Sequence, residues 1–256
     1  MQKYREFATV YFPNNPILPI TVEHLVLFIA FCMHKNLALN TVSSYVSMLN
    51  CVQGMAGFHD FSHNFVIKKS LEGYRKQKAK ADSRLPITPV ILKKLIEALQ
   101  HMNLPKFTQI LLKAMLLLAF HAFLRVGEIT QSGSKTKNII AFSSVKFLII
   151  AGNNPHAVQL NMEQFKHSTG KSCHKLQIQC NDKPPGTCPV HALWDYCQVR
   201  GSQPGSLFCF LDGKSVSRQF FTQHLKLLLH WAGCNNKNYN GHSFRIGYSS
   251  QYGYFR

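Results

Sequence analysis

A segment near the middle of the chain has residue types that suit phosphate binding. In HAFLRVGEI (residues 121–129), Arg125 follows a long apolar run and Glu128 lies three residues later. On a helix face this spacing places the carboxylate beside the guanidinium and lets it orient the arginine. A planar guanidinium donates paired hydrogen bonds to phosphate oxygens. Arg125 is therefore a candidate phosphate-binding residue, with Glu128 as its support.

A second segment, near the C-terminal end, has a related composition. In GHSFRIG (residues 241–247), His242 and Arg245 are one helical turn apart and can face the same point. An imidazole titrates near neutral pH and can transfer protons as well as contact phosphate. The segment therefore predicts a second half of the same site.

Together the two segments resemble a known family. FLRVGEIT and GHSFRIG, in this order, resemble the first-arginine box and the His-x-x-Arg box of tyrosine recombinases, which include the phage integrases. Residues 207–233 (LFCFLDGKSVSRQFFTQHLKLLLHWAG) also resemble the stretch before the second box. The similarity runs from the first predicted helices onward and is strongest to recombinases of eukaryotic mobile elements of the Crypton and DIRS kind.

The resemblance implies a DNA strand-exchange reaction. Members of this family attack a DNA phosphodiester with a tyrosine, form a 3′-phosphotyrosyl link, and need neither a metal nor another cofactor. Arg125 and Arg245 match the family's arginines, and His242 matches its histidine. The family also has a lysine between its second and third strands as general acid. Lys166 fits that pattern, and Lys171 remains the alternative.

The resemblance breaks at the nucleophile. In the family the tyrosine follows the second box after a further helix, whereas only 11 residues follow Arg245 here. Tyr248, Tyr252 and Tyr254 continue the segment of Arg245 and are poorly placed for in-line attack. No nucleophile is assigned, and we expect no DNA cleavage by this chain alone. The alternatives are a non-catalytic DNA-binding protein derived from a mobile-element recombinase, and an active enzyme whose sequence is incomplete.

The charge of the chain predicts a polyanionic partner. Lys and Arg number 29 against 11 Asp and Glu, which gives a net charge of +18. Such an excess favours double-stranded DNA, because lysines and arginines release its condensed counterions. Other recombinase protomers are expected partners in a synaptic complex. The predicted DNA-binding residues are Lys68, Lys69, Arg75, Lys76, Lys78, Lys80 and Arg84.

Other compartments and ligands are disfavoured. No stretch has the length of a membrane span or the form of a signal peptide, and no amphipathic segment pairs an apolar face with a basic one. The eight cysteines include no C-x-x-C pair, so an intracellular location is expected, the nucleus in a eukaryote. Cys180, Cys188 and His191 are close in sequence, but they lack a matching second half, and no metal is assigned.

The predicted fold is mostly α with an α+β catalytic domain. We expect a helical core-binding (SAM-like) domain at 1–81, a basic linker at 82–89, and a catalytic-like domain at 90–256. Thr21 and Asn40 or Thr41 are predicted to cap the second and third helical segments. Hydrophobic periodicity predicts helices at 22–35, 65–80, 88–98, 106–120, 188–199 and 217–232, and a three-stranded antiparallel sheet at 145–150, 157–162 and 174–180.

Overall fold

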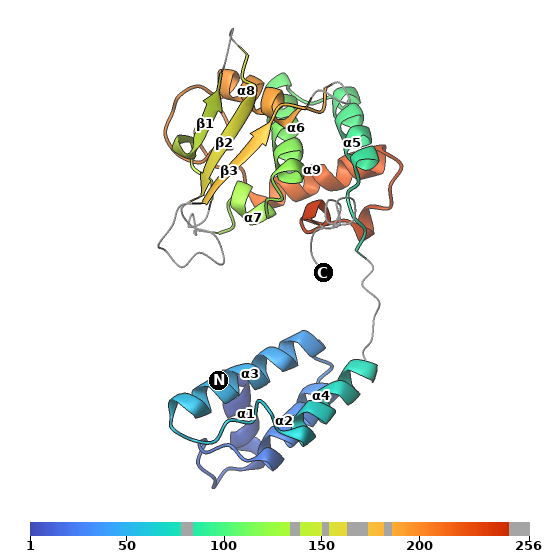
Figure 1. The fold of residues 1–256 in the computed structure, drawn as a ribbon. Coiled ribbons are helices and arrows are strands. Elements are labelled where there is room, and N and C mark those ends of the chain that lie inside the picture. Colours follow the sequence, from blue (N-terminus) through green and yellow to red (C-terminus); the bar gives the residue numbers. More distant parts are fainter. Residues whose placement is uncertain (78–83, 134–138, 150–153, 163–173, 182–185, 246–256) are drawn as a thin grey trace. The chain divides into compact units, whose positions relative to one another are not determined.

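The computed structural model describes residues 1–77, 84–133, 139–149, 154–162, 174–181 and 186–245. The backbone divides into two compact units, Met1–Asp82 and Ser83–Arg256. Figure 1 shows helices alone in the described part of the first unit, and helices with a small sheet in the second. The predicted fold class, mostly α with a three-stranded antiparallel sheet, is confirmed.

The N-terminal unit is built from four helices: α1 (Gln2–Tyr11), α2 (Val22–His34), α3 (Leu39–Met55) and α4 (Phe65–Gln77). Its core is rich in aromatic rings, and the ring of Tyr4 packs edge-on against Phe28. Gln53 is buried on α3, where its side-chain amide accepts from the backbone of Ile20 and donates to the carbonyls of Ile20 and His59. Because a buried amide is costly when unpaired, these bonds fix the chain segments around α3.

The helix starts in this unit show where local signals decide. Thr21 caps α2 as predicted, since its hydroxyl accepts from the His24 amide at 3.2 Å. The cap predicted at Asn40 or Thr41 is wrong, because α3 already begins at Leu39 without a side-chain cap. Leu37 and Leu39 pack against the core, and burying them outweighs a cap worth about 1 kcal/mol.

The C-terminal unit surrounds one apolar helix. Its helices are α5 (Pro89–His101), α6 (Lys106–His121), α7 (Val126–Ile129), α8 (Pro189–Arg200) and α9 (Arg218–Trp231), with short 3-10 turns η1 (Phe142–Ser144) and η2 (Asn236–Asn238). α6 packs against α8 and α5, and α5 also contacts α9. Every residue of α6 from Leu116 to Ala119 is fully buried. This helix is the central support of the unit.

The sheet has three antiparallel strands in the order β1-β2-β3. They are β1 (Val145–Leu148), β2 (Ala157–Met162) and β3 (His174–Gln179). In the central strand β2, Leu160 pairs with Val145 of β1 and Val158 pairs with Ile178 of β3. All three strands were predicted, and their bounds agree within two residues.

One arginine of this unit has a structural role. Arg200 ends α8, is buried, and donates to the carbonyls of Leu207, Gly201, Gln203 and Ser206. Its guanidinium also lies over the ring of Phe142, 4.1 Å from the centroid. Arg200 is therefore occupied by the protein itself.

Every helix in the described ranges falls short of the length and continuous apolar character that a span requires.

Candidate functional site

The first arginine stands at a turn after the central helix. α6 ends at His121, and Phe123 then adopts a left-handed backbone conformation with φ of 53°. The buried Leu124 donates its N–H to the Ala119 carbonyl at 3.2 Å and anchors this turn. Arg125 thereby becomes the N-cap residue of α7. The expectation that Arg125 and Glu128 share one helix face is corrected, because Arg125 has extended backbone just before that helix.

Glu128 nevertheless holds Arg125 in place. The Glu128 carboxylate accepts from the Arg125 guanidinium Nη1 at 3.0 Å and from the Arg125 backbone N–H at 2.7 Å. The side chain of Glu128 is 9% exposed and that of Arg125 is 29% exposed. The carboxylate accepts from one guanidinium nitrogen, so the other guanidinium N–H groups can donate to a ligand. Such an arrangement fixes the fork while keeping it available to an anion.

The two predicted boxes lie against each other. A Cβ placed on Gly241 would lie 2.6 Å from Cγ2 and 3.1 Å from Cβ of Val126. The residue after Arg125 and the residue before His242 are thus in direct contact, although they are 115 positions apart in sequence. Only glycine allows this approach without moving Val126. The pairing of the boxes in space therefore depends on Gly241.

The second box is held by its own turn and by the core. Asn240 Oδ1 accepts from the His242 N–H at 2.8 Å, and the Asn240 N–H donates to Ser243 Oγ at 3.0 Å. Phe244 is fully buried and its ring lies 6.2 Å from that of Phe221 on α9. Arg245 N–H donates to the His242 carbonyl at 3.0 Å, as in a first helical turn. His242 and Arg245 are thus mounted on one rigid turn.

The segment that enters the unit runs beside this turn. Leu85 N–H donates to the Asn238 carbonyl at 2.8 Å, and Ile87 N–H donates to the Ser243 carbonyl at 2.9 Å. These bonds carry the exposed Arg84 to the second box. Arg84, expected as part of a basic linker, is therefore a neighbour of the site.

A further arginine was missed by sequence reasoning. Gln131, just beyond the first box, accepts from the Arg218 N–H at 2.9 Å and donates to the Val216 carbonyl at 2.8 Å. This parallel bridge places the exposed start of α9 beside the first box. Ser217 caps α9 and was visible in the sequence as a helix start. The bridge to Gln131 is a long-range contact that no local pattern indicates.

The pKa of His242 is influenced by the charges of four arginines. The pKa of His242 is lowered below its ordinary value of 6.5, first by partial desolvation of the ring and then by the charges of Arg84, Arg245, Arg218 and Arg125. Charges act strongly only within roughly a Debye length, about 10 Å. The charges of all four arginines therefore disfavour the protonated imidazole, and a bound anion would offset them.

The remaining predicted site residues either lie on α4 of the N-terminal unit or are outside the described residues. Lys166 and Lys171, the two candidates for the general acid, lie outside the described residues, as do Lys78 and Lys80. On α4 of the N-terminal unit, Lys68, Lys69, Arg75 and Lys76 are all exposed. Lys69 forms an ion pair with Glu72 at 2.8 Å. These α4 side chains form an exposed basic surface.

The tyrosines of the C-terminal unit could act as nucleophiles of a strand-cleavage reaction only where they are exposed. Among its described residues they are Tyr196 and Tyr239, and both are buried. The Tyr196 hydroxyl donates to the carbonyl of Cys209 at 3.0 Å, and burial raises the pKa of both tyrosines. Neither offers an accessible phenolate. Tyr248, Tyr252 and Tyr254 lie outside the described residues.

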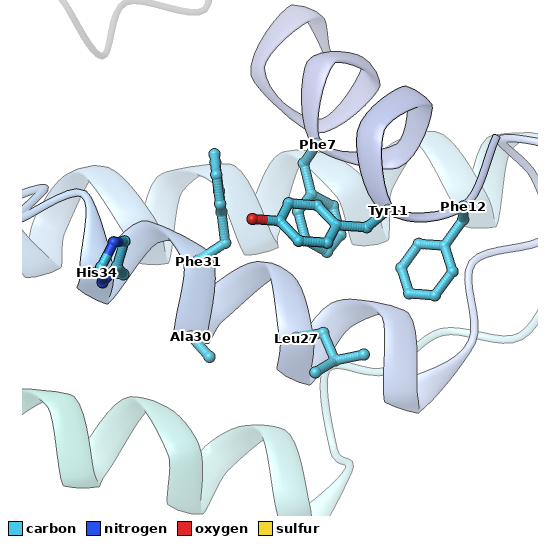
Figure 2. Close-up of a pocket in the computed structure, with 7 residues that line it drawn as sticks. All are labelled: Phe7, Tyr11, Phe12, Leu27, Ala30, Phe31 and His34. Carbon is cyan, nitrogen blue, oxygen red and sulfur yellow. The ribbon is translucent and has the colours of Figure 1, made fainter.

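An apolar pocket in the N-terminal unit is a different kind of feature. It has a volume of about 250 Å³ between α1 and α2 (Figure 2) and is lined by Phe7, Tyr11, Phe12, Leu27, Ala30, Phe31 and His34. Its lining includes neither a lysine nor an arginine, so it does not suit a phosphate.

The chain has the tyrosine recombinase (integrase) fold. Three solved structures carry this result. The XerH site-specific recombinase, bound to a palindromic difH substrate after cleavage, matches with a TM-score of 0.55 and 12% identity. A lambda integrase dimer bound to a COC′ core site matches with 0.54 and 16%, and the Tn1549 transposon integrase with circular intermediate DNA matches with 0.55 and 12%.

The matches cover nearly all of this chain but a smaller share of each solved chain. They cover 97% of this chain for XerH and 98% for the other two. Of the solved chains they cover 65%, 82% and 85%, so this chain spans less than two thirds of the XerH chain. No protein-family model matches the sequence, and no curated protein matches it significantly. At these identities the similarity establishes the fold.

Proposed function

We propose that this chain is a recombinase-like DNA-binding protein that holds one DNA phosphodiester between Arg125, His242 and Arg245. The observation that carries the proposal is the contact between Val126 and Gly241, which brings the residue after Arg125 against the residue before His242. The positive charges of Arg125 and Arg245, which help to lower the pKa of His242, agree with this placement. The solved relatives by fold are bound to DNA, which supports DNA as the polyanion that this basic chain takes.

The proposed chemistry follows from the groups available. Phosphoryl transfer needs fixed positive charge at the non-bridging oxygens of the reacting phosphate. Arg125, oriented by Glu128, and Arg245, mounted beside His242, supply it with fork-shaped donors. His242, whose pKa is lowered, is largely neutral at pH 7 and can accept a proton. Lys166 is proposed as the general acid, with Lys171 as the alternative.

The remaining basic residues are proposed to contact flanking phosphates. Arg84 and Arg218 border the phosphate site, and α4 presents Lys68, Lys69, Arg75 and Lys76 to solvent. Such contacts add affinity through counterion release without requiring a fixed geometry. Because lambda integrase is a dimer on its core site, other protomers are proposed to join the complex on DNA.

A second candidate is DNA binding without strand cleavage, in a protein derived from a mobile-element recombinase. Among the described residues of the C-terminal unit, the burial of Tyr196 and Tyr239 favours it, because neither can attack a phosphate. In this candidate the site would still hold the phosphate but would form no covalent intermediate.

Two assays on the full chain test the proposal. Fluorescence anisotropy with a labelled duplex should give an affinity that falls steeply with salt, and binding that is weak and independent of salt would overturn the proposal. A pool of nicked suicide duplexes of random sequence then separates the two candidates. A covalent protein–DNA adduct identifies a recombinase with a working tyrosine, whereas binding without an adduct identifies the non-cleaving protein.

A further inference from the structure

Two cysteines and a histidine meet at the junction between the sheet and α8. Cys180 directly follows β3, Cys188 is the residue before α8, and His191 lies in the first turn of α8. Cys180 Sγ lies 3.2 Å from Cys188 Sγ and 3.3 Å from His191 Nε2. The ligand atoms of all three residues lie within 4.8 Å of one another. The sequence alone had assigned no metal here.

The spacing of these atoms suits a tetrahedral metal ion. With Zn–S of about 2.3 Å and Zn–N of about 2.0–2.1 Å, tetrahedral angles give S···S of about 3.8 Å and S···N of about 3.5 Å. The observed separations of 3.2 and 3.3 Å are a few tenths of an ångström shorter. Small side-chain rotations would open the cluster to these values. Three ligands would then leave the fourth position to a water molecule.

The surroundings of the cluster also favour zinc. Cys188 is the N-cap residue of α8, and His191 lies three residues later in the first turn of that helix, with its ring nitrogen within 4.8 Å of the Cys188 sulfur. The positive end of the α8 dipole favours a thiolate at that start. Two thiolates would neutralise a divalent cation, which suits a place where Cys188 is only 4% exposed. Thiolate and imidazole are the donors that select zinc over calcium or magnesium.

We propose that Cys180, Cys188 and His191 bind a zinc ion that joins the end of β3 to the start of α8. The ion would link the end of β3 to the start of α8. Helix α8 packs directly on α6, the helix that precedes Arg125. The proposed role is structural. It is independent of DNA binding and would hold even if the chain bound no nucleic acid.

The test uses the full chain, purified under reducing conditions without a chelator. We expect one zinc per chain by elemental analysis, and replacement by Co²⁺ should give the intense visible bands of a tetrahedral thiolate site. Cys180→Ser, Cys188→Ser and His191→Asn should each weaken Co²⁺ binding more than about 100-fold, since even changes around metal ligands cost 10–100-fold. Cys234→Ser is the matched control, because Cys234 is a half-buried thiol of the same unit, and it should bind like wild type.

Another thiol gives an internal check. Cys197 lies on the same helix, where burial raises its pKa to about 12, so it should stay a thiol and leave metal binding unchanged when it is replaced by alanine. If a ligand variant fails to fold, chelation of the wild type decides instead. Removal of zinc should lower its melting temperature, and zinc should restore it.

Three results would overturn the proposal. One is wild-type Co²⁺ binding no tighter than that of Cys180→Ser. Another is a melting temperature that does not change with chelation. The third is a Cys180–Cys188 disulfide in the metal-free native protein, found by mass spectrometry of non-reduced peptides, because it would consume both thiolates.

Discussion

The two units use positive charge in different ways. On α4 of the N-terminal unit, Lys68, Arg75 and Lys76 project into solvent, and their helix is held by the burial of Ile67 and Tyr74 on its other side. In the C-terminal unit, Arg125 is fixed by two hydrogen bonds to a buried carboxylate, and Arg245 is mounted on a turn anchored by Phe244. The α4 side chains supply positive charge without a fixed position, whereas Arg125 and Arg245 supply it at a defined point.

This difference has an energetic consequence for binding to DNA. An exposed lysine contributes mainly counterion release, which is tolerant of position. A prepositioned arginine fork forms charge-assisted bonds without first losing rotational freedom, so each bond contributes more. Loss of a C-terminal arginine should therefore cost more than loss of a lysine on α4.

The largest effect is expected from removal of the arginines. Arg125→Ala or Arg245→Ala should weaken duplex binding about 10- to 100-fold, because a hydrogen bond to a charged group contributes roughly 1.5–3 kcal/mol. Lys76→Ala should weaken it only about two- to fivefold. Anisotropy titrations at one salt concentration measure all three variants. Equal losses would remove the distinction between the two units.

A control separates binding from folding at Arg125. Its removal leaves the buried Glu128 carboxylate without this partner, which itself destabilises the unit. The double variant Arg125→Ala/Glu128→Gln removes that charge and should bind DNA as weakly as Arg125→Ala. Recovery to wild-type affinity would show that the loss came from the carboxylate.

The next effect concerns the contact between the two boxes. Gly241→Ala should lower the free energy of unfolding by about 1–3 kcal/mol, because the new Cβ would overlap Val126. Urea unfolding measures this change. Gly54→Ala on α3 is the matched control, since its Cβ would meet open space, and it should be neutral or stabilising by up to about 1 kcal/mol. Equal behaviour of the two variants would refute a tight contact at Gly241.

A smaller effect is expected in the pH dependence of binding. The pKa of His242 is depressed in the free protein, so this group favours folding above pH 6.5 and withdraws that stability as the pH falls through its folded value. A bound phosphate would raise the same pKa, so DNA should bind more tightly as the pH falls from about 7 to 5.5. We expect the gain to be about three- to tenfold larger in wild type than in His242→Asn. Identical pH profiles would exclude a phosphate contact at His242.

The smallest effect is expected in the salt dependence of the α4 variants. Lys68→Ala/Lys76→Ala should reduce the slope of log K against log salt by about two, because each of the two lysines would otherwise neutralise one phosphate. The loss of affinity should be largest at low salt and should shrink as the salt concentration rises. A slope equal to that of wild type would mean that α4 does not contact DNA.

Much of the fold could be predicted because its signals are local. The pattern of apolar and β-branched residues predicted β2 (Ala157–Met162) at its observed bounds, and Thr21 caps its helix as expected. The start of α3 was missed because packing of Leu39 outweighed the capping preference of Thr41. Local preference therefore failed where burial competed with it.

The candidate site was predictable only in part. Arg125, His242 and Arg245 were identified by the order of two short boxes, a signal that lies within the sequence itself. Arg218 lies beside the first box because of a backbone bridge to Gln131, a contact between distant segments that leaves no periodic trace in the sequence. Cys180, Cys188 and His191 could be seen to lie close in sequence, but only the structure shows that their ligand atoms lie within 4.8 Å of one another.

A double-mutant cycle tests most directly whether the two arginines share one phosphate. Duplex affinities would be measured for wild type, Arg125→Ala, Arg245→Ala and the double variant, with circular dichroism to confirm folding. A shared phosphate predicts a double variant that loses at least about 1 kcal/mol less than the sum of the single losses, whereas Arg125→Ala with Lys76→Ala should be additive within about 0.5 kcal/mol. Additive losses for Arg125→Ala and Arg245→Ala would contradict a common site.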